Sequence, residues 1–511
     1  MAIIRHKSVQ RRTVMKGASA LALTAAAGAC ARQAAAPFSE APTWMTLLGK
    51  SEAGGRDYIP RVEGELPAGL LGSLYRNGPG LFERGGVRIR HLLDGDGLVQ
   101  RLSFSAGGVR YQNKFVRTQK FREEELANKR RYATWTTRKS NNFLDNLGGG
   151  VTQSQAGVTV YPVHGKIIAR DELGPSYEVD AETLETLETI PAGQGLESVG
   201  FKAHSKLDPE TGEWIMAGSQ FGRVMKIHAA IYEPTLKLKT QFSFESPRQV
   251  YIHDFIATKS HLIFVLHPCY FSPLPFLSGM KSFTDSFSWK GDDGNLIAIV
   301  PRAGGEAKFF DAPGSFMWHA LNAYEEGGEI IADIVGYDEP DHFIGDNAFF
   351  YNIMKGRMGR ASSAGMIRRY RINLNAGSLK EEILDSGSHE FPMIDERVAM
   401  TAQRIGYFSC GGLGAFNSGL KRLDYRTGAT REFDFGAETQ VGEPVFAARP
   451  EGDGGVELDQ GWLIAQCLDG KSEKTFFAVF DAETVDRGPV AKIWLEHHVP
   501  ISFHGAWDAA A

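Results

Sequence analysis

Four histidines spread along the second half of the chain each lie in a short stretch with polar and aromatic neighbours. The stretches are KAHSKLDPETG, YIHDFIAT, MWHALNAYE and SFHGAW, which contain His204, His253, His319 and His504. A single histidine of this kind is usually a packed core or loop residue, but neutral imidazole is also the commonest protein ligand of transition metals. No local zinc motif such as HExxH is present. Because the four residues are far apart in sequence, they can share a metal ion only if the fold returns repeatedly to one axis.

Three glutamates are candidates for a supporting role beside such a site. Four neutral imidazoles leave the charge of a divalent cation uncompensated, so we expect carboxylates that accept the free ring N–H groups and fix the orientation of each ring. Glu172, Glu390 and Glu443 lie among apolar, glycine or proline residues in ARDELGPSYEVD, HEFPMIDER and GEPVFAARP. For any one of them an exposed surface carboxylate is the simpler interpretation, but as a trio they suit this role.

The elements that must position these side chains are expected to be strands. From about Ile59 onward, short β-rich runs alternate with turn clusters, and the clearest helical period covers Arg122 to Tyr132. Several turns share one chemistry, in which Asp starts the turn and Thr follows, at 180–183, 208–212, 424–428 and 481–484. Hairpins repeated over this length favour radially arranged four-stranded blades over a two-sheet sandwich. The sequence therefore predicts an all-β propeller, whose inner strands bring remote residues to one axis.

Two long loops interrupt the strand pattern, at 117–158 and 268–292. Both are long enough to form a lid, or a loop and helical cap that builds a substrate tunnel. In the second loop Pro273, Pro275 and Gly279 argue against regular strand pairing. The apolar residues of 268–283 either cap the core or form an exposed patch that contacts a membrane surface or admits an apolar substrate.

Length and composition indicate a globular chain and exclude several classes of protein. The 511 residues are 42% hydrophobic, which is enough to bury a large core, and the formal net charge of −5 offers no basic face for nucleic acid. Beyond the N-terminus no stretch reaches the roughly 18 apolar residues of a membrane-spanning helix. The cysteines are few, widely spaced and without a CxxC pair, so we expect buried free thiols rather than a disulfide framework.

The N-terminal segment resembles a twin-arginine export signal. An arginine pair and a lysine lie within Gln10 to Lys16, a mild apolar run covers Ala18 to Ala29, and an Ala/Gln/Pro-rich stretch follows through Pro37. We expect residues 1–36 to be a flexible signal segment, residues 37–511 to be a single catalytic domain, and the protein to be periplasmic or otherwise exported. An ordinary basic, frayed terminus is the alternative. Cys30 is a candidate lipid acceptor, although the residues before it are smaller than such sites prefer.

Nine short segments occur in the order of the signatures of the carotenoid cleavage oxygenase family, which the chain resembles from about Asp57 to Trp507. The segments are LYRNGPG, HLLDGDGLV, NKFVRT, AHSKLDP, IHDF, HALNAYE, EFPMID, GEPVF and FHGAW. The resemblance implies a seven-bladed β-propeller with non-haem Fe(II) on its axis, held by four histidines of which three are supported by glutamates. By motif, the ligands are His204, His253, His319 and His504, and the supporting glutamates are Glu172, Glu390 and Glu443. Glu172 matches least closely, because the family commonly has an aromatic residue before this glutamate and the chain has Asp171.

The resemblance also implies a reaction. The family inserts both atoms of O2 across one carbon-carbon double bond, giving two carbonyl products without an organic cofactor. We therefore expect an Fe(II)-dependent dioxygenase that cleaves a carotenoid or apocarotenoid-like substrate, a hydrophobic conjugated molecule whose burial contributes about 25 cal/mol per Å2.

Other functions remain open at this point. Stilbene-cleaving relatives resemble one another in using a lysine with a nearby tyrosine to bind a phenolic hydroxyl, and the stretch 147–158 contains no lysine. This favours an apocarotenoid over a stilbenoid or phenylpropanoid without excluding the latter. Isomerisation or ester cleavage at the iron without O2 incorporation is another alternative, and a non-catalytic, ligand-binding propeller is a third.

Overall fold

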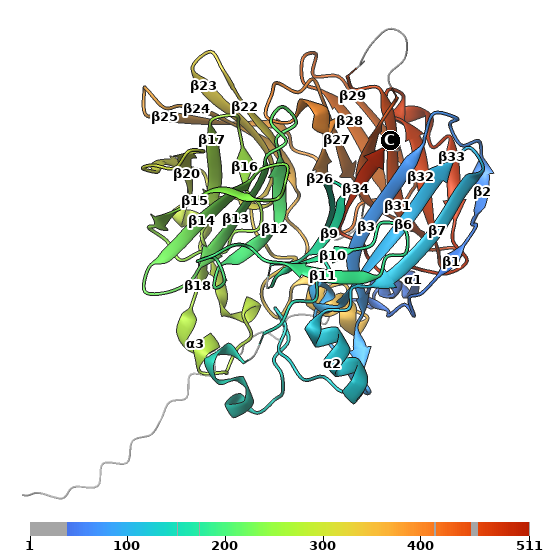
Figure 1. The fold of residues 1–511 in the computed structure, drawn as a ribbon, viewed down its shortest axis with the longest axis horizontal. Helices are drawn as coiled ribbons and strands as arrows, with labels where there is room; N and C mark the ends of the chain where they lie inside the picture. The colour runs from blue at the N-terminus through green and yellow to red at the C-terminus, as the bar shows by residue number, and fades with distance from the viewer. Residues whose placement is uncertain (1–37, 151, 173, 413–414, 451–457, 510–511) are drawn as a thin grey trace, which may run out of the picture. The chain divides into compact units, whose positions relative to one another are not determined.

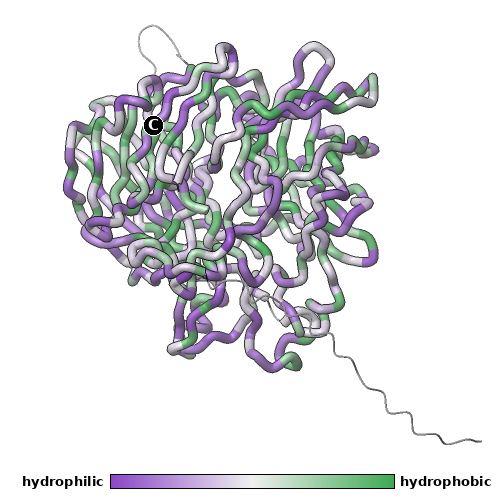
Figure 2. Tube along the Cα trace, turned by 180° about the vertical axis from the view of Figure 1, so that it is seen from behind, coloured by the Kyte–Doolittle hydropathy of each residue, from purple (hydrophilic) through white to green (hydrophobic). Residues whose placement is uncertain are grey.

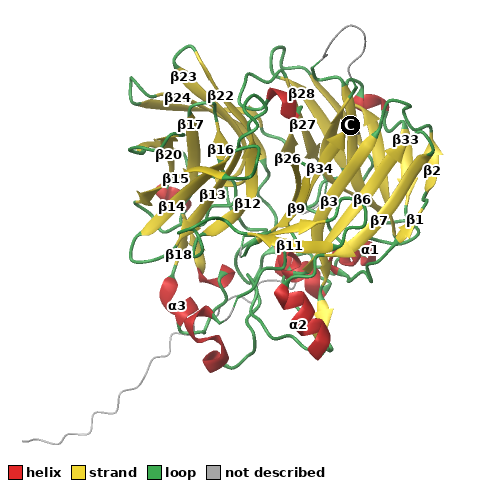
Figure 3. Cartoon of the chain, viewed as in Figure 1, coloured by secondary structure: helices red, strands yellow, loops and turns green. Residues whose placement is uncertain are grey.

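Seven antiparallel sheets of four or five strands make up most of the chain in the computed structural model (Figures 1 and 3). The structure describes residues 38–150, 152–172, 174–412, 415–450 and 458–509. The compact unit that contains the sheets begins at Ser39. The expected signal segment, with Cys30, lies outside the described residues. Each sheet is one blade of a seven-bladed β-propeller.

Five blades are formed by strands that follow one another along the chain. In order from the innermost strand outward they are β12 (Gly200–Leu207), β13 (Trp214–Gln220), β14 (Met225–Tyr232) and β15 (Leu238–Ser246); β16 (Ile256–Ala257), β17 (His261–Leu266), β20 (Asn295–Pro301) and β21 (Lys308–Ala312); β22 (Phe316–Glu326), β23 (Glu329–Tyr337), β24 (Met366–Asn373) and β25 (Ser378–Asp385); β26 (His389–Met393), β27 (Ile405–Cys410), β28 (Gly419–Asp424) and β29 (Thr430–Asp434); and β8 (Thr159–Val163), β9 (Lys166–Arg170), β10 (Ser176–Val179) and β11 (Thr186–Ile190).

The two remaining blades combine strands from both ends of the chain. One contains β34 (His504–Ala509), β3 (Gly72–Leu81), β6 (Asp96–Ser105), β7 (Gly108–Phe115) and β1 (Asp57–Tyr58), and the other contains β30 (Thr439–Ala448), β31 (Gly461–Asp469), β32 (Lys474–Asp481), β33 (Ala491–Trp494) and β2 (Arg61–Gly64). Asn77 pairs with His504, and Arg61 pairs with Trp494. These pairings close the ring, because each end of the chain completes a sheet begun by the other.

The blades pack face to face, and this explains the burial pattern of their strands. Middle strands such as β17 (HLIFVL) and β23 (EIIADIVGY) are buried on both faces, whereas the outermost strand β15 alternates between exposed and partly buried residues. Apolar side chains of neighbouring blades meet in shared clusters, as Ile263 of β17 and Ile334 of β23 do. Figure 2 shows that apolar residues gather in the strands inside the blades. Hydrophobic burial between sheets therefore holds the ring together.

The predicted turn chemistry is confirmed. Asp180, Asp208, Asp424 and Asp481 each accept a hydrogen bond from the backbone N–H two residues further on, at 3.1, 3.0, 3.0 and 3.0 Å. These aspartates follow or end strands that pair with the next strand of the same blade. The side chain therefore starts the turn by holding the backbone.

A helical cap lies at one end of the propeller (Figure 3). It includes α2 (Gln119–Ala127), η3 (Phe143–Gly149), α3 (Pro273–Leu277) and η4 (Thr284–Ser286); the other short helices are α1 (Thr43–Thr46), η1 (Leu47–Gly49), η2 (Leu92–Asp94), η5 (Gly291–Asp293), α4 (Phe349–Asn352), η6 (Ile353–Lys355), η7 (Glu396–Val398) and η8 (Val485–Arg487). No helix in the described ranges is long and apolar enough to span a membrane.

Two details of the predicted cap were wrong. The helix expected over Arg122 to Tyr132 spans Gln119–Ala127, because Thr118 caps its start and Asn128 adopts a left-handed conformation (φ 42°) that ends it. The loop 268–292 does contain paired strands, β18 (Cys269–Phe271) and β19 (Phe287–Trp289). Its prolines lie between these strands, in α3, where they interrupt no strand pairing.

The smaller remaining elements agree with the sequence-based expectations. A two-residue hairpin joins β4 (Glu83–Arg84) and β5 (Val87–Arg88). Cys269, Cys410 and Cys467 are buried free thiols, as expected.

Candidate metal centre

The four predicted ligands converge on the propeller axis. His204 lies on β12, His319 on β22 and His504 on β34, which are the innermost strands of their blades, and His253 lies just before β16 rather than on a strand. One ligand atom from each ring lies within 4.8 Å of the others, and all four side chains are buried. The structure therefore brings together residues that are up to 300 positions apart (504 minus 204).

Irregular strand pairing aims these side chains inward. The register of β12 against β13 shifts between Phe201 and Ser205, and that of β22 against β23 shifts between Met317 and Ala320, so both shifts include a histidine. Similar shifts begin at Glu390 in β26 and enclose Glu443 in β30. Bulges of this kind bend a strand and redirect a side chain, and they are common beside functional sites. Proline directly follows Glu443, and this was a sequence signal for such a bulge.

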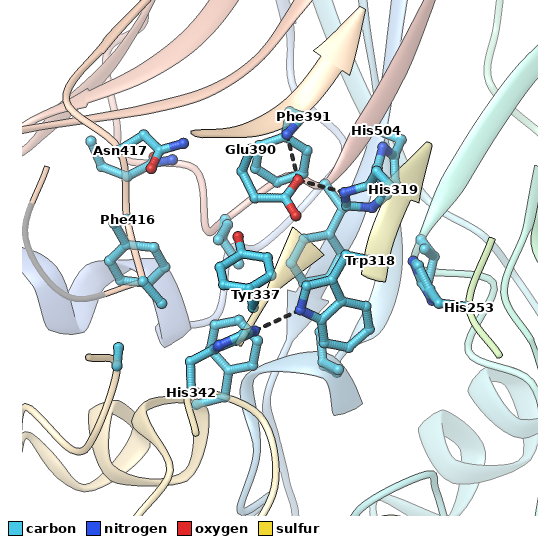
Figure 4. A pocket seen from close by; sticks show the side chains of 18 of the residues that line it. His253, Trp318, His319, Tyr337, His342, Glu390, Phe391, Phe416, Asn417 and His504 are labelled. Carbon is cyan, nitrogen blue, oxygen red and sulfur yellow. Dashed lines mark hydrogen bonds and ion pairs between the residues drawn. The ribbon is translucent and has the colours of Figure 1, made fainter. Parts of the chain in front are cut away.

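Each of the three predicted glutamates contacts one histidine. His319 Nδ1 donates to Glu390 Oε2 at 2.5 Å, His504 Nδ1 donates to Glu443 Oε1 at 2.9 Å, and His253 Nδ1 donates to Glu172 Oε1 (Figure 4). A ring whose Nδ1 carries the proton has an unprotonated Nε2. Nε2 of His319 is buried and has no hydrogen-bond partner, and Nε2 of His204 and His253 are 3.2 Å apart. This arrangement suits nitrogen lone pairs directed at a shared cation.

His204 differs from the other three because a tyrosine, not a carboxylate, lies beside its Nδ1. The hydroxyl of Tyr161, on β8, is 3.4 Å away. Burial raises the pKa of Tyr161, so its hydroxyl stays protonated and neutral. The sequence analysis missed this residue. The alternation in TVYPV predicts a strand but does not indicate which ring the tyrosine approaches.

The surroundings of the glutamates differ in charge. Burial raises the pKa of Glu172 to about 7, although Lys202 at 3.4 Å and the Tyr251 hydroxyl at 3.0 Å both favour its ionised form. Burial would also raise the pKa of Glu443, but His504 and Arg76 outweigh it and the pKa is lowered. Glu443 is thus the more firmly ionised of the two carboxylates.

Arg76 was not recognised as part of the site from the sequence. Its side chain is fully buried, and Nη1 lies 3.7 Å from Glu443 Oε2. The guanidinium also donates to the carbonyl oxygen of Glu443 at 3.0 Å and to Ser502 Oγ at 3.0 Å. Arg76 therefore links the N-terminal strand β3 to the C-terminal segment that carries His504.

Asp171, which stands where the family commonly has an aromatic residue, has a structural partner. Its carboxylate accepts the backbone N–H groups of Gln155 at 2.7 Å and Ala156 at 3.0 Å. Asp171 thereby holds the end of the long loop 117–158 beside Glu172. The departure from the family pattern leaves Glu172 in contact with His253.

A cavity lined mainly by apolar and aromatic side chains opens onto the histidines. It reaches His253, His319 and His504, and its aromatic lining residues are Trp135, Trp318, Tyr337, Phe350, Phe391, Phe416 and Phe503 (Figure 4). No lysine or arginine lines it among the described residues. The loop 117–158 contributes to the lining, as expected for a tunnel. The segment 337–363 also contributes, and the sequence analysis did not single it out.

The fold and this site define a propeller with an all-histidine metal centre on its axis. Residues 50–509 match the family described as retinal pigment epithelial membrane protein, and the chain belongs to this family, the carotenoid cleavage oxygenases. The predicted family and the predicted seven-bladed fold are both confirmed.

Several characterised proteins are similar over most of the chain. An apocarotenoid-15,15'-oxygenase of Synechocystis is 28% identical, with 88% of this chain and 93% of that protein covered. An isoeugenol monooxygenase of Pseudomonas putida is 27% identical, with 88% and 94% covered. The crystal structure of a cobalt-substituted Synechocystis apocarotenoid oxygenase has a TM-score of 0.85 and 27% identity, and covers 93% of this chain and all of that one. The chain is therefore an oxygenase of the carotenoid, apocarotenoid and stilbene cleavage type.

Proposed function

We propose that the protein is an Fe(II)-dependent dioxygenase that cleaves a carbon-carbon double bond of a carotenoid or apocarotenoid-like substrate with O2, giving two carbonyl products. One observation carries the proposal: the nitrogens of four buried histidines lie within 4.8 Å of one another, and three of the rings border an apolar, aromatic cavity. The first feature suits a redox-active metal, and the second suits a conjugated hydrocarbon.

The chemistry of the donors fits Fe(II). Burial and the neighbouring histidines lower the pKa of His204 and His253 well below the ordinary value, so both rings are neutral and their lone pairs are free to bind a cation. The ligands would be His204, His253, His319 and His504, with Glu172, Glu390 and Glu443 balancing charge. Iron held in this way would supply O2 binding and activation.

The remaining task of the chain is to place the substrate. The glutamates fix the three ring orientations, so the metal-binding nitrogens are positioned before the substrate enters. Phe391 stacks on His319 with ring centroids 5.4 Å apart, and Trp318 packs edge-on against His253 at 4.7 Å. These apolar walls exclude water and hold a planar conjugated segment beside the metal centre. The shape of the cavity would decide which double bond is cleaved.

The proposed reaction is tested on purified, iron-loaded protein. A panel of carotenoids, apocarotenals and stilbenes is incubated with isotopically labelled O2, and the products are identified by mass spectrometry. We expect two carbonyl products from an apocarotenoid, each carrying label. Unlabelled products would instead support isomerisation or ester cleavage, and binding without any product would support a non-catalytic propeller.

A stilbenoid or phenylpropanoid substrate is the second candidate. It is favoured by the similarity to isoeugenol monooxygenase and to lignostilbene-α,β-dioxygenase isozyme III of Sphingomonas paucimobilis, which is 25% identical over 88% of this chain and 93% of that protein. The absence of lysine and arginine from the described lining of the cavity argues against recognition of a phenolate by a cation. The same panel decides between the two classes.

We also propose that the cap contacts a membrane surface through residues 268–283. Leu274, Leu277 and Met280 are exposed by 79, 51 and 62% of their surface, and the neighbouring turn η3 exposes Phe143, Leu144 and Leu147. A group of exposed apolar side chains favours insertion at a lipid interface. Flotation with neutral phosphatidylcholine vesicles tests this. The Leu274→Asp/Leu277→Asp variant should stay in the unbound fraction, and equal flotation of both proteins would contradict the proposal.

Export by residues 1–36 is likewise proposed from the arginine pair and the apolar run that follows it. N-terminal sequencing of protein recovered from the periplasm would locate the cleavage site. Recovery of uncleaved protein only from the cytoplasm would contradict export, and mass spectrometry of the mature N-terminus would test lipidation of Cys30.

A further inference from the structure

Three buried histidines outside the metal centre have tautomers that the structure defines. Nδ1 of His91 accepts from the Leu93 N–H at 3.1 Å, and Nδ1 of His267 accepts from the Met317 N–H at 3.3 Å. Nε2 of His342 accepts from the indole N–H of Trp318 at 2.6 Å (Figure 4). Since an N–H can only donate, each accepting nitrogen is unprotonated, and the neutral ring carries its proton on the other nitrogen.

His342 differs from the other two in where its protonated nitrogen lies. The second nitrogens of His91 and His267 are enclosed by the protein. His342 lines the cavity that leads to the metal centre, although only 3% of its surface is exposed. Its Nδ1 has no hydrogen-bond partner among the described residues, and it is not one of the enclosed nitrogens. Burial lowers the pKa of His342 to about 4, so the ring is neutral near pH 7. The cavity wall therefore contains a single unpaired donor at this position.

The position of this donor is fixed by packing. The His342 ring lies 4.7 Å from Tyr337 and 5.5 Å from Phe350, measured between ring centroids, and the Trp318 hydrogen bond holds its far side. Trp318 itself packs against His253. One indole thus separates the donor from a predicted metal ligand. A substrate that reaches the metal centre passes close to this N–H.

We propose that His342 is a specificity-determining residue whose Nδ1–H donates a hydrogen bond to an oxygen atom of the substrate. The substrate would then be a conjugated alkene that carries an acceptor oxygen, in a carbonyl, ether or hydroxyl group, near the bond that is cleaved. A buried donor without a partner is costly, and a bound acceptor removes that cost. This inference rests on the proposed function for the identity of the ligand class, but the hydrogen bond can be measured without turnover.

The test compares two ligands of matched shape in the absence of O2. The probes are para-methoxystilbene and para-ethylstilbene, in which a methylene replaces the ether oxygen, and isothermal titration of the iron-loaded protein gives both dissociation constants. We expect the wild-type protein to bind the methoxy compound about 10-fold more tightly, as befits a buried hydrogen bond. An apocarotenal and the hydrocarbon with methyl in place of its aldehyde provide a second pair.

Two variants separate the role of Nδ1 from that of the ring. His342→Asn places an amide nitrogen as far from Cβ as Nδ1, so it should retain the preference in at least one probe pair. His342→Gln places its amide at the position of Nε2, so it can still accept from Trp318 but should lose the preference. Because the result is a ratio within each variant, general damage to the cavity affects both ligands and cancels.

Gln440 supplies the control for polarity elsewhere in the cavity. It lines the same cavity, and only 5% of its surface is exposed. Gln440→Leu should keep the preference. The proposal is overturned if the wild-type protein shows no preference in either probe pair, if His342→Asn and His342→Gln give the same ratio, or if Gln440→Leu alone abolishes it. Cleavage without any binding preference would refute the inference and leave the proposed reaction standing, and a preference without cleavage would do the reverse.

Discussion

Glu443 and His504 are held together by two hydrogen bonds across neighbouring inner strands of the propeller. The carboxylate accepts His504 Nδ1–H at 2.9 Å through Oε1 and the Gly505 N–H at 2.6 Å through Oε2. Arg76 approaches the same carboxylate from β3. The orientation of one predicted metal ligand therefore depends on the junction where both ends of the chain meet.

Replacing Glu443 by glutamine should weaken iron binding or slow turnover by about 10- to 100-fold, which is typical of a partner that orients a metal ligand. The amide keeps the size of the side chain but removes the negative charge that balances the cation. Iron content by elemental analysis and kcat on an apocarotenal measure the effect. Glu438→Gln, at an exposed position, is the matched control, and equal values for both variants would contradict the assignment.

Replacing His253 or His504 by alanine should remove iron and activity together. Each change leaves three imidazoles and a carboxylate, Glu172 or Glu443, without its ring partner. Elemental analysis after iron loading checks the prediction, with His228→Ala on β14 as a control distant in the fold. Full iron occupancy in the His253 and His504 variants would show that these residues are not ligands.

Arg76→Met should lower the free energy of unfolding by about 3–5 kcal/mol, because it leaves the buried carboxylate of Glu443 without a compensating charge. It also removes the hydrogen bonds to Ser502 Oγ and the carbonyl oxygen of Phe503 that help to close the ring. Urea denaturation measures the change. Arg61→Met, at an exposed ion pair, should alter stability by less than about 1 kcal/mol. Similar losses for both variants would refute the special role of Arg76.

The ion-pair cluster of Arg302 predicts a dependence of stability on pH. Arg302 contacts Asp208 at 2.7 Å and Glu213 at 2.6 Å. Burial would raise the pKa of each carboxyl group, but the pairing outweighs it and both are lowered below their ordinary values of 3.8 and 4.5. A carboxyl group whose pKa is lower in the folded state adds stability above its unfolded pKa and loses it as the pH falls through its folded pKa.

The wild-type protein should therefore lose more stability between pH 5 and pH 3 than Arg302→Met does, apart from the lower starting value of the variant. Urea denaturation at several pH values gives the two curves. Arg426→Met, an exposed arginine on the turn after β28, serves as the control. Parallel curves for the wild-type protein and Arg302→Met would rule out this contribution.

Much of the fold could be anticipated from local patterns. Aspartate-led turns have a chemistry that is complete within a few residues, and Asp208 and Asp424 behave as that chemistry requires. Runs such as HLIFVL indicate buried strands because every side chain is apolar. Helix boundaries were less predictable. The end of α2 depends on the left-handed conformation of Asn128, which the charged run up to Tyr132 does not reveal.

The sequence by itself determined which residue types could form the centre: four histidines and three glutamates, each within a short motif that survives reading out of context. Only the tertiary structure decided how they meet. Tyr161 beside His204, Arg76 beside Glu443 and the Trp318–His342 pair join residues on different blades or on the cap, and no local pattern encodes such contacts. The physical reason is that closure of the ring sets these distances, through burial between blades and strand pairing between the two ends of the chain.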